Sequence, residues 1–147
     1  MSSVLRPGPL NLISDVAGVT VGHATDERCR TGVTTVLVDG FWSASVDVRG
    51  GGPGSRETEA LAPENVVGRV HAIVLGGGSV FGLAAADGVT AALSASGRGL
   101  HLKPGAPAIP LVPAAVLHDL ANGGDKQWGL EPPYRRLGLA SVDAAQA

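Results

Sequence analysis

The clearest pattern of hydrophobic and polar positions lies between residues 71 and 93. A short apolar run at 72–75 is followed by three glycines and a serine at 76–79. Apolar side chains then recur at helical spacing, at Leu83, Ala86, Val89 and Leu93. An apolar run bounded by glycines is typical of a buried strand, and the spacing after it is typical of an amphipathic helix. The pattern predicts a strand, a glycine turn and a helix from about residue 81 to about residue 96.

The upstream pattern predicts three further strands. Residues 16–23 alternate between apolar and polar, residues 32–39 are rich in β-branched side chains, and residues 43–48 alternate again. The pair Asp39-Gly40 between the last two is a strong turn sequence. Because the connections are short, we expect an antiparallel meander. The glycine-rich stretch 49–58 after it predicts a loop.

The second half of the chain gives weaker patterns. A helical turn is expected at 57–61, and four prolines exclude a long central strand over 99–113. Residues 114–120 favour a strand, with a short helix as the alternative. Residues 134–147 favour a helix, and the absence of a stop sequence in its last turn favours a chain cut there, with a frayed terminus as the alternative.

Composition bounds the class of protein. The chain has 147 residues, the size of one domain, with 22 glycines and only 3% aromatic residues. These values predict layers packed closely through small side chains. A net charge of -2 without a basic run excludes nucleic acid and anionic membrane surfaces as expected partners. With a single cysteine, Cys29, no apolar leader and no apolar run near the ~20 residues that span a bilayer, a soluble cytoplasmic protein is expected.

The glycine turn first suggests a phosphate site, because such turns expose backbone N–H groups at a helix start. Residues 76–82 match neither G-x-x-x-x-G-K-S/T nor G-x-G-x-x-G followed by a distant carboxylate. Nucleotide binding is therefore disfavoured, and no cofactor is predicted. The turn brings backbone close to either a ligand or another chain segment.

Other candidate chemistry is incomplete. The polar cluster after the first strand matches no zinc spacing, so no metal is predicted; it comprises His23, Asp26, Glu27 and Cys29. His118 lies among apolar residues and is either a satisfied core histidine or a functional group. Ser55 and Ser79 lie in glycine loops but not in a G-x-S-x-G elbow. A complete nucleophilic site is not visible in this sequence.

Five motifs occur in order along nearly the whole chain: DVAGVTVGH at 15–23, GVTTV at 32–36, DVRGGGPGSRET at 47–58, GGSVFGLAAADGV at 77–89 and IPLVPAAV at 109–116. Together they resemble the amino-terminal half of the DmpA-like family. That family comprises L-aminopeptidase/D-esterases, β-peptidyl aminopeptidases and nylon-oligomer hydrolases. The resemblance is specific for the family and leaves open a peptide, a D-amino ester, a β-peptide or a nylon oligomer as substrate.

The resemblance implies an α/β fold that is part of a four-layer αββα sandwich of the N-terminal-nucleophile-like hydrolase type. Residues 1–147 would form a single partial domain, with 1–12 as an extended arm. Such precursors cut themselves to expose an amino-terminal Ser or Thr on a β subunit, whose free α-amine serves as base. Family members carry a G-A-G loop ending in Lys, an Asn and the cleavage site after this point, and this sequence contains none of them. We therefore expect the amino-terminal portion of the α subunit, inactive without its carboxy-terminal partner.

The resemblance also assigns roles to particular residues. His118 occupies the position of an active-site tyrosine, where it could donate a hydrogen bond to an oxyanion or to the substrate. The residues expected to bind substrate are Gly52, Gly54, Ser55, Gly77, Gly78 and Ser79. The expected partners are the β subunit, a small peptide or amide, and further copies in an oligomer. The alternative function is a non-catalytic module that binds a small anion or serves as a structural subunit.

Overall fold

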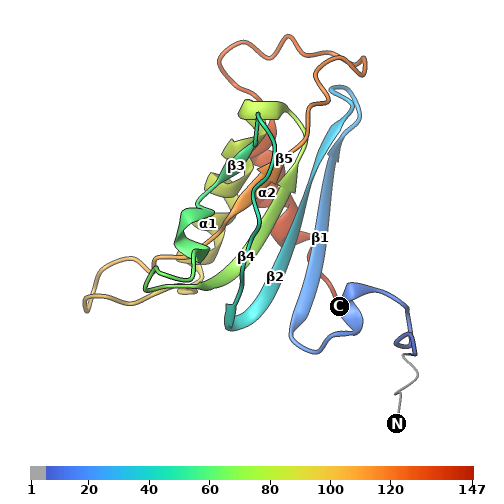
Figure 1. The fold of residues 1–147 in the computed structure, drawn as a ribbon. Coiled ribbons are helices and arrows are strands. Elements are labelled where there is room, and N and C mark those ends of the chain that lie inside the picture. Colours follow the sequence, from blue (N-terminus) through green and yellow to red (C-terminus); the bar gives the residue numbers. More distant parts are fainter. Residues whose placement is uncertain (1–5) are drawn as a thin grey trace.

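The computed structural model describes residues 6–147, so the first five residues of the predicted arm lie outside it. A five-stranded sheet in the order β1-β2-β4-β5-β3 carries two α-helices, and both lie on one face (Figure 1). The strands are β1 (Val19–Asp26), β2 (Thr31–Ser43), β3 (Ser55–Arg56), β4 (Arg69–Gly76) and β5 (Ala114–Val116). The helices are α1 (Ala85–Ala95) and α2 (Tyr134–Asp143), with 3-10 turns η1 (Ile13–Asp15), η2 (Glu59–Leu61) and η3 (Ser79–Ala84).

Most of the predicted elements are confirmed. The strand expected at 16–23 is β1, shifted toward the carboxyl end, and the strand expected at 32–39 is β2, which is longer and extends to Ser43; the two pair antiparallel. The strand before the glycine turn is β4, and the helix after it begins as η3 and continues as α1. The strand expected at 114–120 is the shorter β5, which pairs parallel with β4. No helix in the described part of the chain is long and apolar enough to cross a membrane.

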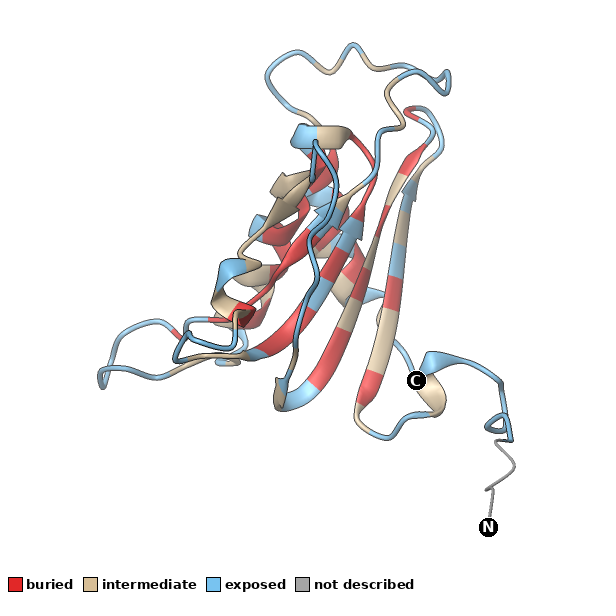
Figure 2. Cartoon of the chain, viewed as in Figure 1, coloured by how far each residue is buried: buried red, intermediate tan, exposed pale blue. Residues whose placement is uncertain are grey.

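The third strand predicted at 43–48 is wrong. β2 continues past Asp39-Gly40 through an irregularity between Leu37 and Trp42 and pairs again with β4 up to Ser43. Gly40 has a φ of 80°, so the pair accommodates a bulge instead of a hairpin turn. The following segment, 44–54, runs exposed across the front of the sheet (Figures 1 and 2), and β4 takes the place of the predicted strand.

The core lies between the sheet and the two helices. The hydroxyls of Thr35 on β2 and Ser141 on α2 lie 2.6 Å apart, and both side chains are fully buried. Gly88 and Gly138 allow α1 and α2 to touch, because a Cβ at either position would meet backbone of the other helix. The apolar core comprises Val33, Leu37, Ala72, Val74, Ala85, Ala86, Val89, Leu93, Val112, Ala114, Tyr134 and Leu137. The predicted packing through small side chains is thus present.

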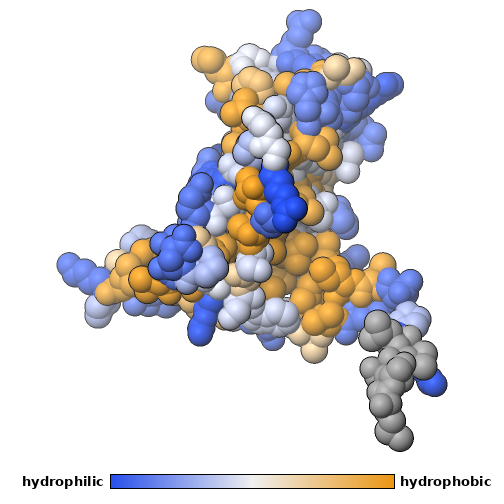
Figure 3. All heavy atoms as spheres, in the orientation of Figure 1, coloured by the Kyte–Doolittle hydropathy of each residue, from blue (hydrophilic) through white to orange (hydrophobic). Residues whose placement is uncertain are grey.

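The opposite side of the sheet has no helix over it. A Cβ at Gly22 of β1 would point toward the backbone of α2, so the side chains of the adjacent residues on β1 point to the opposite side of the sheet. The pairing register of the strands identifies the residues on β2, β4 and β5 that point to the same side. The apolar side chains on this side define the open face: Val21, Val36, Ile73, Leu75, Ala115 and Leu117. Ile73 is 37% exposed and Leu75 is 49% exposed. Hydrophobic residues accordingly gather at the centre of this side of the molecule (Figure 3).

The helix predicted to run to residue 147 ends at Asp143. The chain then returns to the sheet, where the N–H of Gln146 donates to the C=O of Val21 at 3.1 Å and the N–H of Val21 donates back at 2.9 Å. These two bonds add a short antiparallel bridge to the edge of β1 and prevent further helix. The proline-rich segment forms no long strand, only a bridge between Leu100 and Ile109.

Candidate functional site

The glycine turn between β4 and η3 is fixed by hydrogen bonds to the rest of the chain. Three consecutive N–H groups donate hydrogen bonds within the chain. The N–H of Gly77 donates to the C=O of Gly32 at 3.0 Å, and the N–H of Gly78 donates to Oδ1 of Asp119 at 2.7 Å. The N–H of Ser79 donates to the C=O of Leu117 at 3.0 Å. An anion would need these donors. The turn is therefore a packing point between chain segments, which disfavours a role as an anion cradle.

The glycines of the turn are required by their neighbours. A Cβ at Gly77 would meet the side chains of Asp119 and Thr31, and a Cβ at Gly78 would meet the ring of Tyr134. Gly78 also has a φ of 84°, which disfavours any residue with a side chain. Of the two possibilities that the sequence left open for this close approach, the structure shows chain against chain.

Asp119 is the polar residue that organises the turn, and the sequence did not single it out. Its Oδ2 accepts a hydrogen bond from the hydroxyl of Thr31 at 2.6 Å, and its Oδ1 accepts from the N–H of Gly78. Bonds to a carboxylate are stronger than bonds between neutral groups. We call this arrangement the Asp119 clamp; it joins β2, the glycine turn and the segment after β5.

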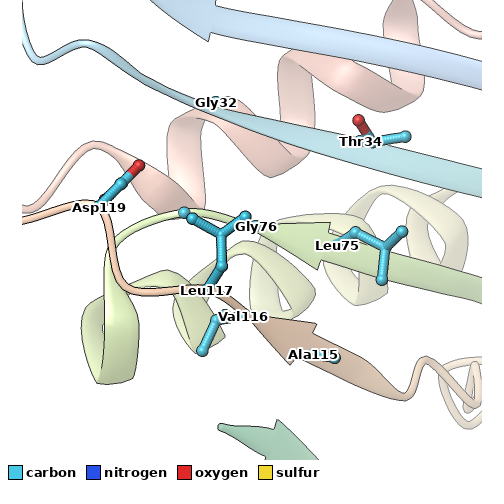
Figure 4. Close-up of a pocket in the computed structure, with 9 residues that line it drawn as sticks. Gly32, Thr34, Leu75, Gly76, Ala115, Val116, Leu117 and Asp119 are labelled. Atoms are coloured by element: carbon cyan, nitrogen blue, oxygen red, sulfur yellow. The ribbon is translucent and has the colours of Figure 1, made fainter. Parts of the chain in front are cut away.

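An open cavity of about 390 Å³ lies beside the clamp on the open face. Its volume is within the range of about 300–1,000 Å³ that is usual for small-molecule sites. Thr34 on β2, Leu75 on β4 and Ala115 on β5 lie side by side across its floor, and Asp119 lies at the end next to the turn (Figure 4). The cavity is lined by Gly32, Thr34, Leu75, Gly76, Gly77, Ala115, Val116, Leu117 and Asp119.

The structure brings most of the predicted substrate-binding residues to this region. Gly77 lines the cavity, and Gly78 and Ser79 complete the turn beside it. The C=O of Gly54 accepts from the N–H of Val116 at 2.8 Å, and Ser55 pairs with Ala115 on the neighbouring strand. Gly52 is exposed, and a Cβ there would meet no other atom within 4 Å, so it lies apart from the cavity wall.

His118 is exposed, so the alternative of a buried core histidine is wrong. It lies between two residues that line the cavity, Leu117 and Asp119, but does not itself line it. Its backbone therefore passes beside the cavity, and its exposed side chain is open to contact with a further chain segment.

Tyr134 supports the turn from the core side. The side chain is completely buried, its ring contacts Trp128 edge to face at a centroid distance of 5.8 Å, and Gly78 packs against it. Among residues 6–147 its hydroxyl has no hydrogen-bond partner. Burial raises the pKa of this phenol above its ordinary value, so the hydroxyl stays neutral.

The polar cluster near the β1–β2 connection is a structural cap. Asp26 accepts from the N–H of Cys29 at 2.9 Å and pairs with Arg136 of α2 at 2.9 Å; the bond from Cys29 is the main cause of its lowered pKa. His23 Nδ1 lies 2.8 Å from Oγ1 of Thr34, at the edge of the cavity. In the part of the chain that the structure describes, no three potential metal-ligating side chains lie together.

Comparison with known proteins decides the family. Residues 11–146 match the model of peptidase family S58. The chain belongs to this family. The resemblance to the DmpA-like hydrolases, which constitute family S58, is thereby confirmed.

The relatives in family S58 extend beyond the matched region. An uncharacterized aminopeptidase of Mycobacterium tuberculosis is 41% identical over 92% of this chain and 42% of its own length. One from Mycobacterium leprae is 42% identical over 82% of this chain and 35% of its own length. A 6-aminohexanoate-oligomer endohydrolase of a Kocuria species is 31% identical over 97% of this chain and 36% of its own length. The chain thus spans about two fifths of the length of the curated relatives that it matches.

Proposed function

We propose that this chain is the amino-terminal α portion of a self-processing amide or peptide hydrolase. Its Ser or Thr nucleophile would lie on a carboxy-terminal segment that follows the region present here. The observation that carries the proposal is the open face. A five-stranded sheet with helices on one side and exposed apolar residues on the other has half of the layers of an αββα sandwich.

The exposed apolar surface of the open face is suited to packing against a second sheet. Ile73, Leu75 and Leu117 are 37%, 49% and 63% exposed, and together they form a contiguous apolar surface with their neighbours on β1, β2 and β5. Burying such a surface stabilises a protein by roughly 25 cal/mol for each Å² removed from water. Packed sheets place their inner faces about 10 Å apart. The greater length of the relatives supports the presence of a segment that could supply that sheet.

The chemistry would be divided between the two segments. An amino-terminal Ser or Thr on the second segment would supply the hydroxyl as nucleophile and the α-amine as base, since that amine has a reference pKa of about 7.7–8.0. The present chain would supply the cavity wall and the exposed imidazole of His118 as a hydrogen-bond donor to the oxyanion or to substrate. Because the N–H groups of Gly77, Gly78 and Ser79 are already donated, their contribution would be the shape of the wall.

The same donors weigh against the alternative of a small-anion-binding module. A non-catalytic structural subunit would also keep the fold and the open face, so the experiment has to separate it from the hydrolase. An oligomeric assembly, expected from the family, is compatible with both.

The test is production of the full-length protein and measurement of its intact mass. We expect two polypeptides that remain associated, the second of which begins with Ser or Thr, and hydrolysis of members of a panel of small peptides, amides and oligoamides. Replacement of that Ser or Thr by Ala should leave one uncut chain without activity. A single uncut polypeptide that hydrolyses amides contradicts self-processing. An uncut protein without hydrolysis, whatever its oligomeric state, favours the structural subunit.

A further inference from the structure

Another cavity lies at the opposite end of β4 from the Asp119 clamp. It has a volume of about 280 Å³, and its lining includes His71 of β4 and Arg98, which follows α1. A Cβ at Gly40 or Gly97, which also line it, would meet no other atom within 4 Å, so a ligand has room to enter. At about 3.4 Å for each residue of a strand, His71 lies roughly 17 Å from Gly76 at the end of β4 (Figure 1). The cavity is therefore separate from the one beside the glycine turn.

Arg98 contributes a guanidinium group with free donors to this cavity. One of its terminal nitrogens donates to the C=O of Val38 at 2.6 Å, and the side chain forms no salt bridge among residues 6–147. A guanidinium carries five N–H donors in a planar fork that fits the oxygens of carboxylate and phosphate. The bond to Val38 fixes the position of the group, and its charge and most of its donors remain for a ligand.

His71 contributes a further donor. The side chain is only 5% exposed, and its Nδ1 accepts from the N–H of Leu111 at 3.1 Å. A neutral imidazole whose Nδ1 accepts carries its proton at Nε2, and this N–H donates to no group in the described part of the chain. The ring of Phe41 stacks on the imidazole at a centroid distance of 4.6 Å, and the guanidinium of Arg69 lies 5.4 Å from the centre of that ring. A largely buried donor thus lines the cavity without an acceptor.

The surroundings contain little that would repel an anion. None of the described residues that line the cavity is acidic. The carboxylate of Asp39 lines an adjoining cavity on Arg98 and does not line this one. The carboxyl end of α1 lies nearby and disfavours negative charge. Its C=O groups at Leu93 and Ser94 already accept from the N–H groups of Arg98 and Gly97, which reduces this effect.

We propose that Arg98 and His71 bind a small oxyanion, a carboxylate or a phosphate, in this cavity. The guanidinium supplies the charge and a pair of N–H donors, and the imidazole supplies one more. The anion would satisfy a largely buried donor that is otherwise unpaired. Because Phe41, His71 and Arg98 come from β2, β4 and the segment after α1, the bound anion would also hold three parts of the fold together. This site goes beyond the proposed hydrolase function and does not depend on it.

The experiment measures thermal unfolding of the full-length protein in increasing phosphate or acetate, with chloride keeping the ionic strength constant. We expect a saturable rise of the unfolding midpoint, by about 2–4 °C at about 20 mM anion for a Kd of roughly 1 mM. Arg98→Gln should remove most of that rise. Arg135→Gln, which removes one charge at an exposed position of α2, should retain it. Each variant is compared with its own midpoint without the anion, because Arg98→Gln also removes the bond to Val38.

A rise that is equal in Arg98→Gln and the wild type overturns the inference, as does the absence of a rise with either anion. A rise with only one of the two supports it and identifies the anion class. If Arg98→Gln does not fold, NMR of the wild type replaces the comparison. The ring signals of His71 should then shift saturably with the anion, and unchanged signals would refute the site. Because no substrate is used, the result is independent of whether the protein is a hydrolase.

Discussion

Asp119 accepts a hydrogen bond from the backbone N–H of Gly78 at 2.7 Å, although the two residues lie 41 positions apart in the sequence. The second carboxylate oxygen accepts from Thr31, 88 positions away. One side chain thereby accepts hydrogen bonds from two partly buried donors. The conformation of the glycine turn depends on this carboxylate as well as on the turn itself.

Asp119→Ala should lower the free energy of unfolding by roughly 1–3 kcal/mol, because it leaves both donors without an acceptor. Asp119→Asn should cost less, since its amide oxygen can still accept from Gly78. Chemical denaturation of the full-length protein measures both. The matched control is His118→Ala at the exposed neighbouring position, which should change stability by no more than about 0.5 kcal/mol. Equal losses at the two positions would contradict the clamp.

Gly78→Ala should destabilise the protein more than Gly97→Ala. Both glycines have a positive φ, 84° and 75°, so both substitutions incur the cost of a left-handed backbone, about 1–2 kcal/mol. A methyl group at Gly97 enters open space, whereas at Gly78 it meets the ring of Tyr134. Overpacking of this kind adds roughly 1–3 kcal/mol. Thermal unfolding of the two variants gives the comparison, and similar midpoints would show that the ring yields without cost.

His71 should make stability depend on pH below neutrality. Burial, and next the charge of Arg98, lower the pKa of this imidazole, and its Nδ1 accepts a bond from the N–H of Leu111 at 3.1 Å. The unfolded chain, with an ordinary pKa of about 6.5, therefore binds a proton before the folded state does. Stability is unaffected by this group above that pKa and falls as the pH drops below it, by at most about 1.4 kcal/mol per pH unit.

His71→Asn should remove this part of the pH dependence, and His101→Asn, at an exposed position, should retain it. The measurement is the free energy of unfolding between about pH 7.5 and pH 5.5. Because the carboxylates titrate at lower pH, the difference between the two variants isolates the imidazole. Parallel curves for the two variants would show that His71 titrates alike in both states.

His118, the exposed residue between the cavity-lining Leu117 and Asp119, should affect catalysis without affecting the fold. If its imidazole donates to the oxyanion or to substrate in the full-length enzyme, His118→Ala should lower kcat about 10²-fold or more. His118→Tyr should restore part of that loss, because a phenol can donate in the same place. Steady-state kinetics of the two variants, with His101→Ala as the exposed control, test the role. An Ala variant with unchanged kcat would exclude it.

Local patterns were sufficient for the strand, glycine turn and helix around residues 71–96, because the apolar spacing changes from a strand run to a helical period there. They were misleading at Asp39-Gly40, which is an ordinary hairpin sequence. In the structure, the pairing of Trp42 with Val70 and of Ser43 with Arg69 extends β2 beyond it. Pairing with a distant strand overrode the local turn preference. The residues around Asp39-Gly40 contain no information about that pairing.

The candidate site was predicted unevenly for the same reason. Gly77, Gly78 and Ser79 stand out in the sequence as a cluster, and so does the loop that contains Gly54. Asp119 does not, because its partners lie far away along the chain and its place at the cavity follows from the parallel pairing of β4 and β5. A strand predicted as far as residue 120 concealed it, since β5 ends at Val116 and leaves Asp119 free to turn toward Gly78.

The tight packing of the glycine turn also affects how its evolution should be interpreted. Gly77, Gly78 and Gly82 are each constrained by an atom of this same chain: the Asp119 side chain, the Tyr134 ring and the carbonyl of Gly77. If homologues preserve these glycines, the reason is that the packed interior has no space for a side chain at these positions. The glycines would then also be preserved in a relative that had lost all activity. Drift at Gly78 should instead be accompanied by a smaller residue at position 134.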